Sequence, residues 1–234
     1  SVESAPVTTY QLSFNSAGGD AVSPVSYVSG DLISITQNPT KANNILLGWK
    51  DAAGNVYGTG WYNGGFPTTP GTYDQTYNAG GGYGDAYIFK LNPSATSYLY
   101  ATYVGGATSY EQGESICVNG SGEAYVCGWT QSTDFPTTAG AFNTAFNGTS
   151  FQDVWVLKLN AAGSALQYST YIGGMYSDYA YAMALNNSGE VYVTGYSTNF
   201  NLDFPTTASA YQASSATSQG GVYVFKLNST GTGL

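Results

Sequence analysis

The tetrapeptide Phe-Pro-Thr-Thr occurs three times in this chain at a constant spacing. It begins at Phe66, Phe135 and Phe204, 69 residues apart each time. A second string, Lys-Leu-Asn, begins at Lys90, Lys158 and Lys226, 68 residues apart each time. Two unrelated strings that keep nearly the same period indicate a repeat architecture. The chain is therefore predicted to be one structural unit written three times.

Each repeat contains four segments with the composition of β-strands. They fall at 32–36, 45–49, 56–61 and 86–91 in the first copy, at 100–103, 115–118, 124–129 and 154–159 in the second, and at 168–171, 182–185, 191–196 and 222–227 in the third. The turn between the second and third segments carries Gly54, Gly122 or Gly189, as a position with positive φ requires. Four strands joined as a meander are typical of a propeller blade. We therefore predict an all-β fold of three four-stranded antiparallel propeller-type blades, at 31–97, 98–165 and 166–234.

The first 30 residues lie outside the repeat and contain one candidate strand, at 10–15. In it Tyr10, Leu12 and Phe14 alternate with polar residues, the period-2 pattern of a half-buried strand. This strand has no counterpart among the later copies. We expect it to be a subunit-contact strand, donated to the sheet edge of a neighbouring copy by β-strand addition.

Composition and charge exclude several classes of partner. The 14 acidic residues outnumber the 5 basic ones, so the formal net charge is −9, although only 8% of residues are charged. Nucleic acid and anionic membrane surfaces are therefore not expected partners, because both require clustered basic residues. The sequence also contains no apolar run of the ~18 residues that a membrane span needs, so no membrane insertion is expected.

The first residue is Ser1, and no basic and apolar leader precedes it. A mature secreted chain would begin in this way, and so would a recombinant fragment. Secretion to the extracellular space or the cell surface is the expected localisation.

The two cysteines, Cys117 and Cys127, both belong to the middle repeat. They flank one hairpin turn, on two strands that should pair antiparallel. A cross-strand disulfide between them is predicted, which would imply an oxidising compartment. Two small buried thiols are the alternative, and the spacing of the cysteines does not decide between them.

Several motifs together resemble the SBBP-type bacterial β-propeller repeat family of secreted proteins. They are the strings TYVGG and TYIGG, the hairpin GEVYVTGYST, the loop opener DFPTT and the closing KLN, and they extend over roughly residues 31–234. The resemblance implies radially arranged four-stranded blades in an extracellular or cell-surface setting, and no defined catalytic residues.

The number of copies departs from the pattern of closed propellers. Such propellers usually have about 4 to 8 blades, whereas this chain has three copies. A fragment, an unusual closure, and a subunit whose open ends are met by other subunits are all compatible with this count. An exposed strand edge is a template for pairing with another chain.

The residues that would carry catalysis or bind a metal are few. Histidine is absent, which removes Ser-His-Asp and Cys-His arrangements together with the commonest metal ligand. Asp85 and Asp153 precede the fourth strand in two copies, but Gly221 takes that place in the third. Acids at such positions are typical of strand ends rather than of catalysts. We expect no enzyme activity and no cofactor; calcium stays open, although no Asp-x-Asp-x-Asp run occurs.

Two kinds of repeated side chain are further candidates for ligand contact. The lysines that open the Lys-Leu-Asn strings are expected to pair with nearby acids rather than to bind an acidic ligand. The aromatic residues in the middle of the Phe-Pro-Thr-Thr loops, Tyr73, Phe142 and Tyr211, are candidate ligand contacts, although an aromatic that anchors its own loop is equally ordinary.

These features favour a non-catalytic extracellular structural protein that self-associates into a filament or a surface array. Its partners would be copies of itself, joined through the N-terminal strand and the open blade edges. The alternative is an adhesin or carbohydrate-binding module that binds surface glycans with the Phe-Pro-Thr-Thr loops.

Overall fold

The structure is a computed structural model, and it describes residues 9–12, 25–28, 33–34, 47–78, 84–148, 151–198, 204–212 and 220–234. Every regular element in these ranges is a β-strand, as predicted from the abundance of Tyr and Thr and the regular Gly turns. No helix that could cross a membrane is found among the described residues.

The first large sheet is antiparallel and has the strand order β3-β4-β5-β6-β7. Its strands are β3 (Ile33–Ser34), β4 (Leu47–Lys50), β5 (Val56–Tyr62), β6 (Asp85–Leu91) and β7 (Tyr98–Val104). Each strand pairs with the next along the chain, so the sheet is a meander.

The four strands β4 to β7 have counterparts in the second sheet, and the third sheet has counterparts of all of these but the last. The second contains β8 (Glu111–Val118), β9 (Ala124–Thr130), β10 (Asp153–Leu159) and β11 (Leu166–Ile172). The third contains β12 (Asp178–Leu185), β13 (Val191–Ser197) and β14 (Gly221–Leu227). The hairpin glycines Gly54, Gly122 and Gly189 have φ values of 88°, 80° and 79°, which confirms the conformation predicted for these turns.

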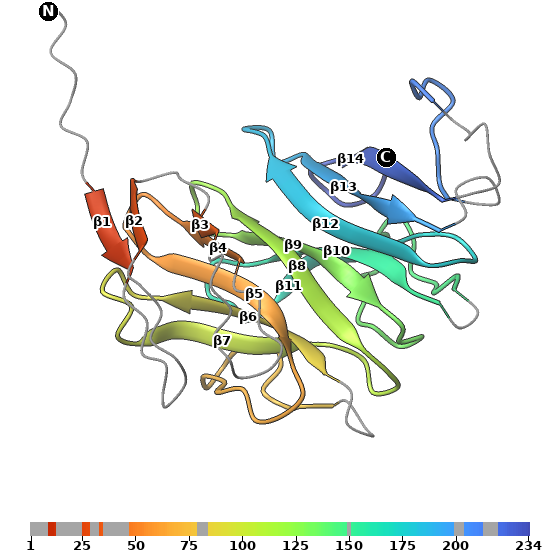
Figure 1. Cartoon of the computed structure of the whole chain (residues 1–234). Helices are drawn as coiled ribbons and strands as arrows, with labels where there is room; N and C mark the ends of the chain where they lie inside the picture. Colours follow the sequence, from red (N-terminus) through yellow and green to blue (C-terminus); the bar gives the residue numbers. More distant parts are fainter. Residues whose placement is uncertain are drawn as a thin grey trace, which may run out of the picture.

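The sheets follow one another along the molecule and bury their facing surfaces (Figure 1). Tyr57 and Ile88 of the first sheet pack with Trp155 and Leu157 of the second. On the other face of the second sheet, apolar side chains of β9 and β10 pack with those of β13 and β14. Alternate residues of each strand therefore serve two separate cores, as the period-2 geometry of a strand requires.

The boundaries of the sheets are offset by one strand from the blades predicted at 31–97, 98–165 and 166–234. β7 and β11, which the prediction placed at the start of the second and third units, pair instead with β6 and β10 of the preceding sheets. The sheets therefore end after residues 104 and 172. A repeat in the sequence fixes the length of the unit but not the strand at which it begins, which is why the boundaries were misplaced.

The predicted N-terminal strand forms a two-stranded sheet within its own chain. β1 (Thr9–Leu12) pairs antiparallel with β2 (Val25–Val28), and Tyr10 lies opposite Tyr27. The expected contact residues Tyr10 and Leu12 are part of β1, whereas Phe14 lies outside the described residues. This hairpin lies at the end of the molecule remote from β14 (Figure 1).

Candidate functional site: the open end of the repeat array

The last strand of each complete sheet is held on both of its edges. One edge of β7 pairs with β6, and the other is hydrogen-bonded by the Phe-Pro-Thr-Thr loop. The Thr69 amide donates to the Ala101 carbonyl oxygen over 3.0 Å, and the Ala101 amide donates to Thr69 Oγ1, also over 3.0 Å. The Tyr103 amide donates to the Asp74 carbonyl oxygen over 3.0 Å.

The second loop holds β11 with the same bonds. The Thr138 amide donates to the Ser169 carbonyl oxygen over 3.0 Å, and the Ser169 amide donates to Thr138 Oγ1 over 2.9 Å. The Tyr171 amide donates to the Asn143 carbonyl oxygen over 3.0 Å. Strand and loop thus form a repeated slot, which we call the strand slot: the edge of the third strand of a four-stranded meander on one side and the Phe-Pro-Thr-Thr loop on the other.

An aromatic trio closes each occupied strand slot. In the first, Phe66 stacks on Tyr87 with ring centroids 4.1 Å apart and meets Tyr103 edge-on at 6.1 Å. In the second, Phe135 stacks on Trp155 at 5.1 Å and contacts Tyr171 at 6.0 Å. The repeated phenylalanine therefore anchors its loop to the sheet and to the inserted strand. This anchoring role was not predicted from the sequence, although an aromatic residue follows the phenylalanine 19 to 21 positions later in every copy.

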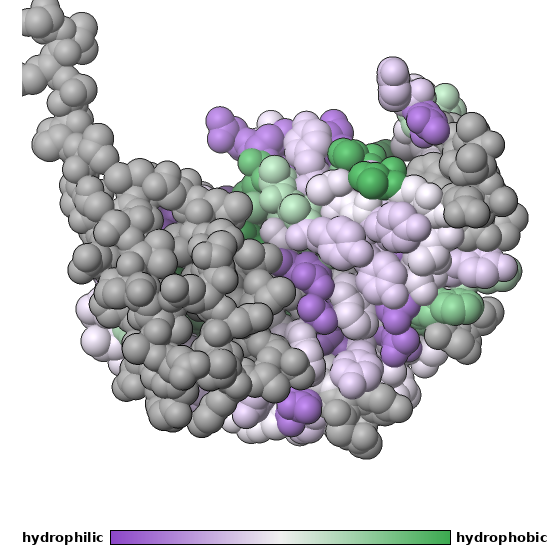
Figure 2. Space-filling model, in the orientation of Figure 1, coloured by the Kyte–Doolittle hydropathy of each residue, from purple (hydrophilic) through white to green (hydrophobic). Residues whose placement is uncertain are grey.

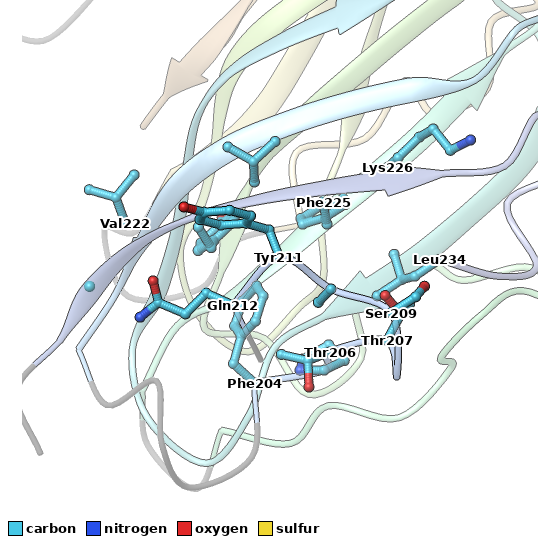
Figure 3. Close-up of a pocket in the computed structure, with 15 residues that line it drawn as sticks. Phe204, Thr206, Thr207, Ser209, Tyr211, Gln212, Val222, Phe225, Lys226 and Leu234 are labelled. Atoms are coloured by element: carbon cyan, nitrogen blue, oxygen red, sulfur yellow. The ribbon is translucent and has the colours of Figure 1, made fainter. Parts of the chain in front are cut away.

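The third strand slot has its walls but no inserted strand in the described part of the chain. Phe204 stacks on Tyr223 at 4.4 Å, as its counterparts do. β14 pairs with β13 alone among the described strands. Between β14 and the loop lies a groove of about 810 Å³, lined by residues of the loop such as Thr207 and Gln212 and by β14 (Figure 3).

One face of the third sheet is exposed where the same face of the other sheets is buried. Tyr57 and Tyr125 are 0% and 1% exposed, whereas Tyr192 at the same position is 39% exposed. Val222 and Val224 are 77% and 71% exposed, whereas their counterparts in β6 and β10 are fully buried. Strongly hydrophobic surface is visible in the region of β14 (Figure 2). The third sheet thus presents side chains suited to packing against a further sheet.

The three candidate loop aromatics occupy different environments. Tyr73 packs against the core between the first and second sheets, and Phe142 packs against the core between the second and third. Their amides donate to the carbonyl oxygens of Gly163 and Gly231, in turns that belong to the following sheet. Tyr211 has no following sheet and is fully exposed. The structure therefore leaves one of the three exposed for ligand contact.

The predicted disulfide between Cys117 and Cys127 is absent, and both residues are buried free thiols. The register places Cys127 opposite Ser115 and Cys117 opposite Tyr125, so the two cysteines are diagonal neighbours. Diagonal Cβ atoms are ~7 Å apart in a sheet, whereas a disulfide needs ~4 Å. The hairpin turn sets this register, because it places Val118 opposite Ala124. Burial raises the pKa of the Cys117 thiol to about 11, which makes it a weak nucleophile.

Buried acids lie in pairs at the two junctions between sheets. A Cβ atom placed on Gly105 would meet Asp85 Oδ1 and Glu111 Oε2, each at 3.0 Å, so both carboxylates border this glycine. Asp153 and Asp178 border Gly173 in the same way at the second junction. Burial raises the pKa of Glu111 to about 8, and the charge of Asp85 contributes to the increase. Within the described residues no three metal-ligating side chains come together.

The repeated lysines form ion pairs within their own sheets. Lys158 Nζ lies 2.7 Å from a Glu123 carboxylate oxygen, and Lys226 Nζ lies 2.8 Å from one of Glu190. Lys90 Nζ lies 3.8 Å from Asp51, which also belongs to a hairpin turn. These contacts confirm the expected pairing of the lysines with nearby acids.

Comparison with known proteins gives no family assignment. No protein-family model matches the chain, and no curated protein matches it. The resemblance to the SBBP-type repeat therefore stays a prediction that rests on the motifs alone.

Proposed function

We propose that this chain is a non-catalytic structural protein that self-associates head to tail outside the cell, into a filament or a surface array. The three sheets act as propeller-type blades in an array that a further copy continues. Its partners are other copies of the chain, and no cofactor takes part. A heterologous contact that does not close on itself builds a filament rather than a ring.

One observation carries this proposal: the third sheet exposes positions that the other two bury. Val222 and Val224 together with Tyr192 form an apolar face beside the unpaired edge of β14. An exposed strand edge next to exposed apolar side chains favours the addition of another chain. The same face is already used twice inside the molecule for sheet-to-sheet packing, which shows the kind of surface that it fits.

A substitution on this face tests the proposal. Val224→Asp places a charge where a second copy would pack, so self-association measured by sedimentation over a range of concentrations should be lost. Leu99→Asp is the matched control, because Leu99 is another exposed apolar residue, on the edge strand of the first sheet. Association that survives Val224→Asp unchanged, or a wild-type chain that stays monomeric at every concentration, would contradict the proposal.

Carbohydrate binding is a second candidate, favoured by the full exposure of Tyr211 beside the groove of the third strand slot. Exposed aromatic rings can stack on the apolar faces of sugars. The candidate rests on one loop instead of three, since Tyr73 and Phe142 are packed against neighbouring sheets. Glycan binding that Tyr211→Ala abolishes and Tyr211→Phe preserves would support it.

A further inference from the structure

We infer that the third strand slot is filled by β2 of a second copy of this chain, whose segment Val25–Val28 inserts antiparallel to β14. This inference rests on the proposed self-association and names the segment that makes the contact. It replaces the strand at 10–15, which the sequence favoured, with its hairpin partner β2.

The sequence of β2 matches the two strands that already occupy such slots. β7 ends in Ala-Thr-Tyr-Val followed by Gly-Gly, and β11 ends in Ser-Thr-Tyr-Ile followed by Gly-Gly. β2 reads Val-Ser-Tyr-Val, and Ser29 and Gly30 follow it. β2 therefore carries the motif of a fourth strand, whereas the third sheet has three strands among the described residues.

The side chains of this motif have defined tasks in the occupied slots. The Thr102 hydroxyl accepts a bond from the Asp74 amide over 2.8 Å and lies 2.9 Å from the Asp74 carbonyl oxygen, and Thr170 does the same with Asn143. Ser26 carries the same hydroxyl, and Gln212 is the corresponding loop residue in the third unit. The Thr and Ser hydroxyls are both donors and acceptors, so the exchange keeps the two bonds.

The tyrosine of the motif completes the aromatic trio. Tyr103 and Tyr171 are buried against Phe66 and Phe135. Tyr27 stands at the matching position of β2 and would pack on the stacked pair of Phe204 and Tyr223. Burial of a tyrosine ring in an aromatic trio supplies much of the apolar contact area of the inserted strand.

The register follows from the two existing pairs of strands. Tyr87 lies opposite Tyr103 and Ile88 opposite Thr102, and Trp155 and Val156 pair with β11 in the same way. By this rule Tyr223 would face Tyr27, and Val224 would face Ser26.

The residue that follows the motif in β2 is not a glycine, and the residue that it would meet in the third slot is not an aspartate. Gly105 and Gly173 follow the motif in β7 and β11, where a Cβ atom would come within 2.9 Å of Asp85 and within 2.7 Å of Asp153. In the third unit the aspartate is replaced by Gly221, and no atom lies within 4 Å of the Cβ position of Gly221. The residue that follows β2 is Ser29, whose side chain the first two slots would exclude. The third slot has the space that this serine needs.

A second copy must supply the strand, because β2 and β14 lie at opposite ends of the molecule (Figure 1). The known pairing of β2 with β1 is a different contact, in which Tyr27 faces Tyr10. Because the slot holds a strand from both sides, insertion gives β2 new neighbours on both edges and replaces its pairing with β1.

Disulfide trapping between two single variants tests this contact. Ser26→Cys chains are mixed with Val224→Cys chains under mild oxidation, and the buried Cys117 and Cys127 are kept in all chains. Facing residues of a sheet lie within disulfide range, so a band at twice the mass of one chain is expected. The control replaces Ser26→Cys with Ser13→Cys, which would face Val224→Cys if the strand at 10–15 were the one inserted.

The outcomes separate this inference from the proposed function. A Ser13→Cys product without a Ser26→Cys product overturns the β2 assignment and leaves self-association standing. Self-association by sedimentation with neither product also overturns the assignment. If the wild-type chain remains monomeric and no pair of cysteine variants gives a product, both the β2 assignment and the proposed function are overturned. Rapid formation of an intramolecular disulfide in the Ser26→Cys/Val224→Cys double variant would show that β2 fills the slot of its own molecule. This result would overturn the assignment of the inserted strand to a second copy.

Discussion

Single residues at the sheet junctions set how the stability of this protein depends on pH. Glu111 is buried beside Asp85, and its carboxylate accepts a hydrogen bond from Thr130 Oγ1 over 2.7 Å. A buried carboxyl group next to another acid keeps its proton in the folded state. The packing of the first two sheets is therefore tied to the protonation of Glu111.

Glu111→Gln should therefore stabilise the protein at high pH. Burial raises the pKa of Glu111 from 4.5 to about 8. Between these values the folded chain holds a proton that the unfolded chain has released, so the free energy of unfolding falls as the pH rises, by up to ~1.4 kcal/mol per pH unit. Urea denaturation at pH 5 and pH 8.5 should show the variant more stable than the wild type at pH 8.5 only.

Glu123→Gln is the matched control for this measurement. Burial raises the pKa of Glu123, but hydrogen bonds from Lys158 and Asn119 outweigh burial and lower it overall. A lowered pKa contributes stability above about pH 4.5 that is lost as the pH falls. Removal of this partly exposed ion pair by Glu123→Gln should lower the free energy of unfolding at pH 8.5 by less than ~1 kcal/mol. Glu111→Gln should raise it at the same pH. Equal effects of both variants at pH 8.5 would contradict the role given to burial.

At the scale of the element, the Phe-Pro-Thr-Thr loop and the fourth strand depend on each other. The loop supplies the hydrogen bonds for one edge of the strand, and the strand supplies a tyrosine for the aromatic trio around the loop phenylalanine. Loop and strand belong to the same sheet, although the sequence repeat groups the strand with the following unit.

Removal of the loop phenylalanine should therefore cost more in a complete unit than in the open one. Phe135→Ala should lower the free energy of unfolding by ~3–5 kcal/mol, because its ring is buried against both Trp155 and Tyr171. Phe204→Ala should cost less in the dilute monomer, where Phe204 stacks on Tyr223, the counterpart of Trp155, but no described strand inserts a tyrosine. Denaturation curves at low protein concentration give the free energy of unfolding of both variants. A larger decrease for Phe204→Ala than for Phe135→Ala would contradict an open third strand slot in the monomer.

The predictable part of the fold was what repeats at short range. Hairpin glycines, the four strands of each unit and the lysine ion pairs follow from local patterns and from spacing. The choice of partner for β7 and β11 does not, because it depends on contacts with a loop about 30 residues away in the sequence. The cysteine register was misjudged because the hairpin turn sets it: the turn places Val118 opposite Ala124, which leaves Cys117 opposite Tyr125 instead of Cys127.

At the scale of the whole molecule, the described strands form successive sheets, of which the second has four strands and the third has three. β2 carries the motif of a fourth strand, and β14 has an open edge among the described strands. The count of repeats suggested open ends from the sequence. The proposed face for continuing the array is the one whose equivalent positions are buried in the first two sheets and exposed in the third.

The size and shape of the native particle test the central claim most directly. Negative-stain electron microscopy of the wild-type chain should show linear rows of particles that lengthen as the protein concentration rises. Added synthetic peptide of residues 23–31 should shorten these rows by occupying the third strand slot, and a peptide of residues 7–15 should not. Monomers at every concentration would contradict head-to-tail association, and closed rings of fixed size would contradict an open filament.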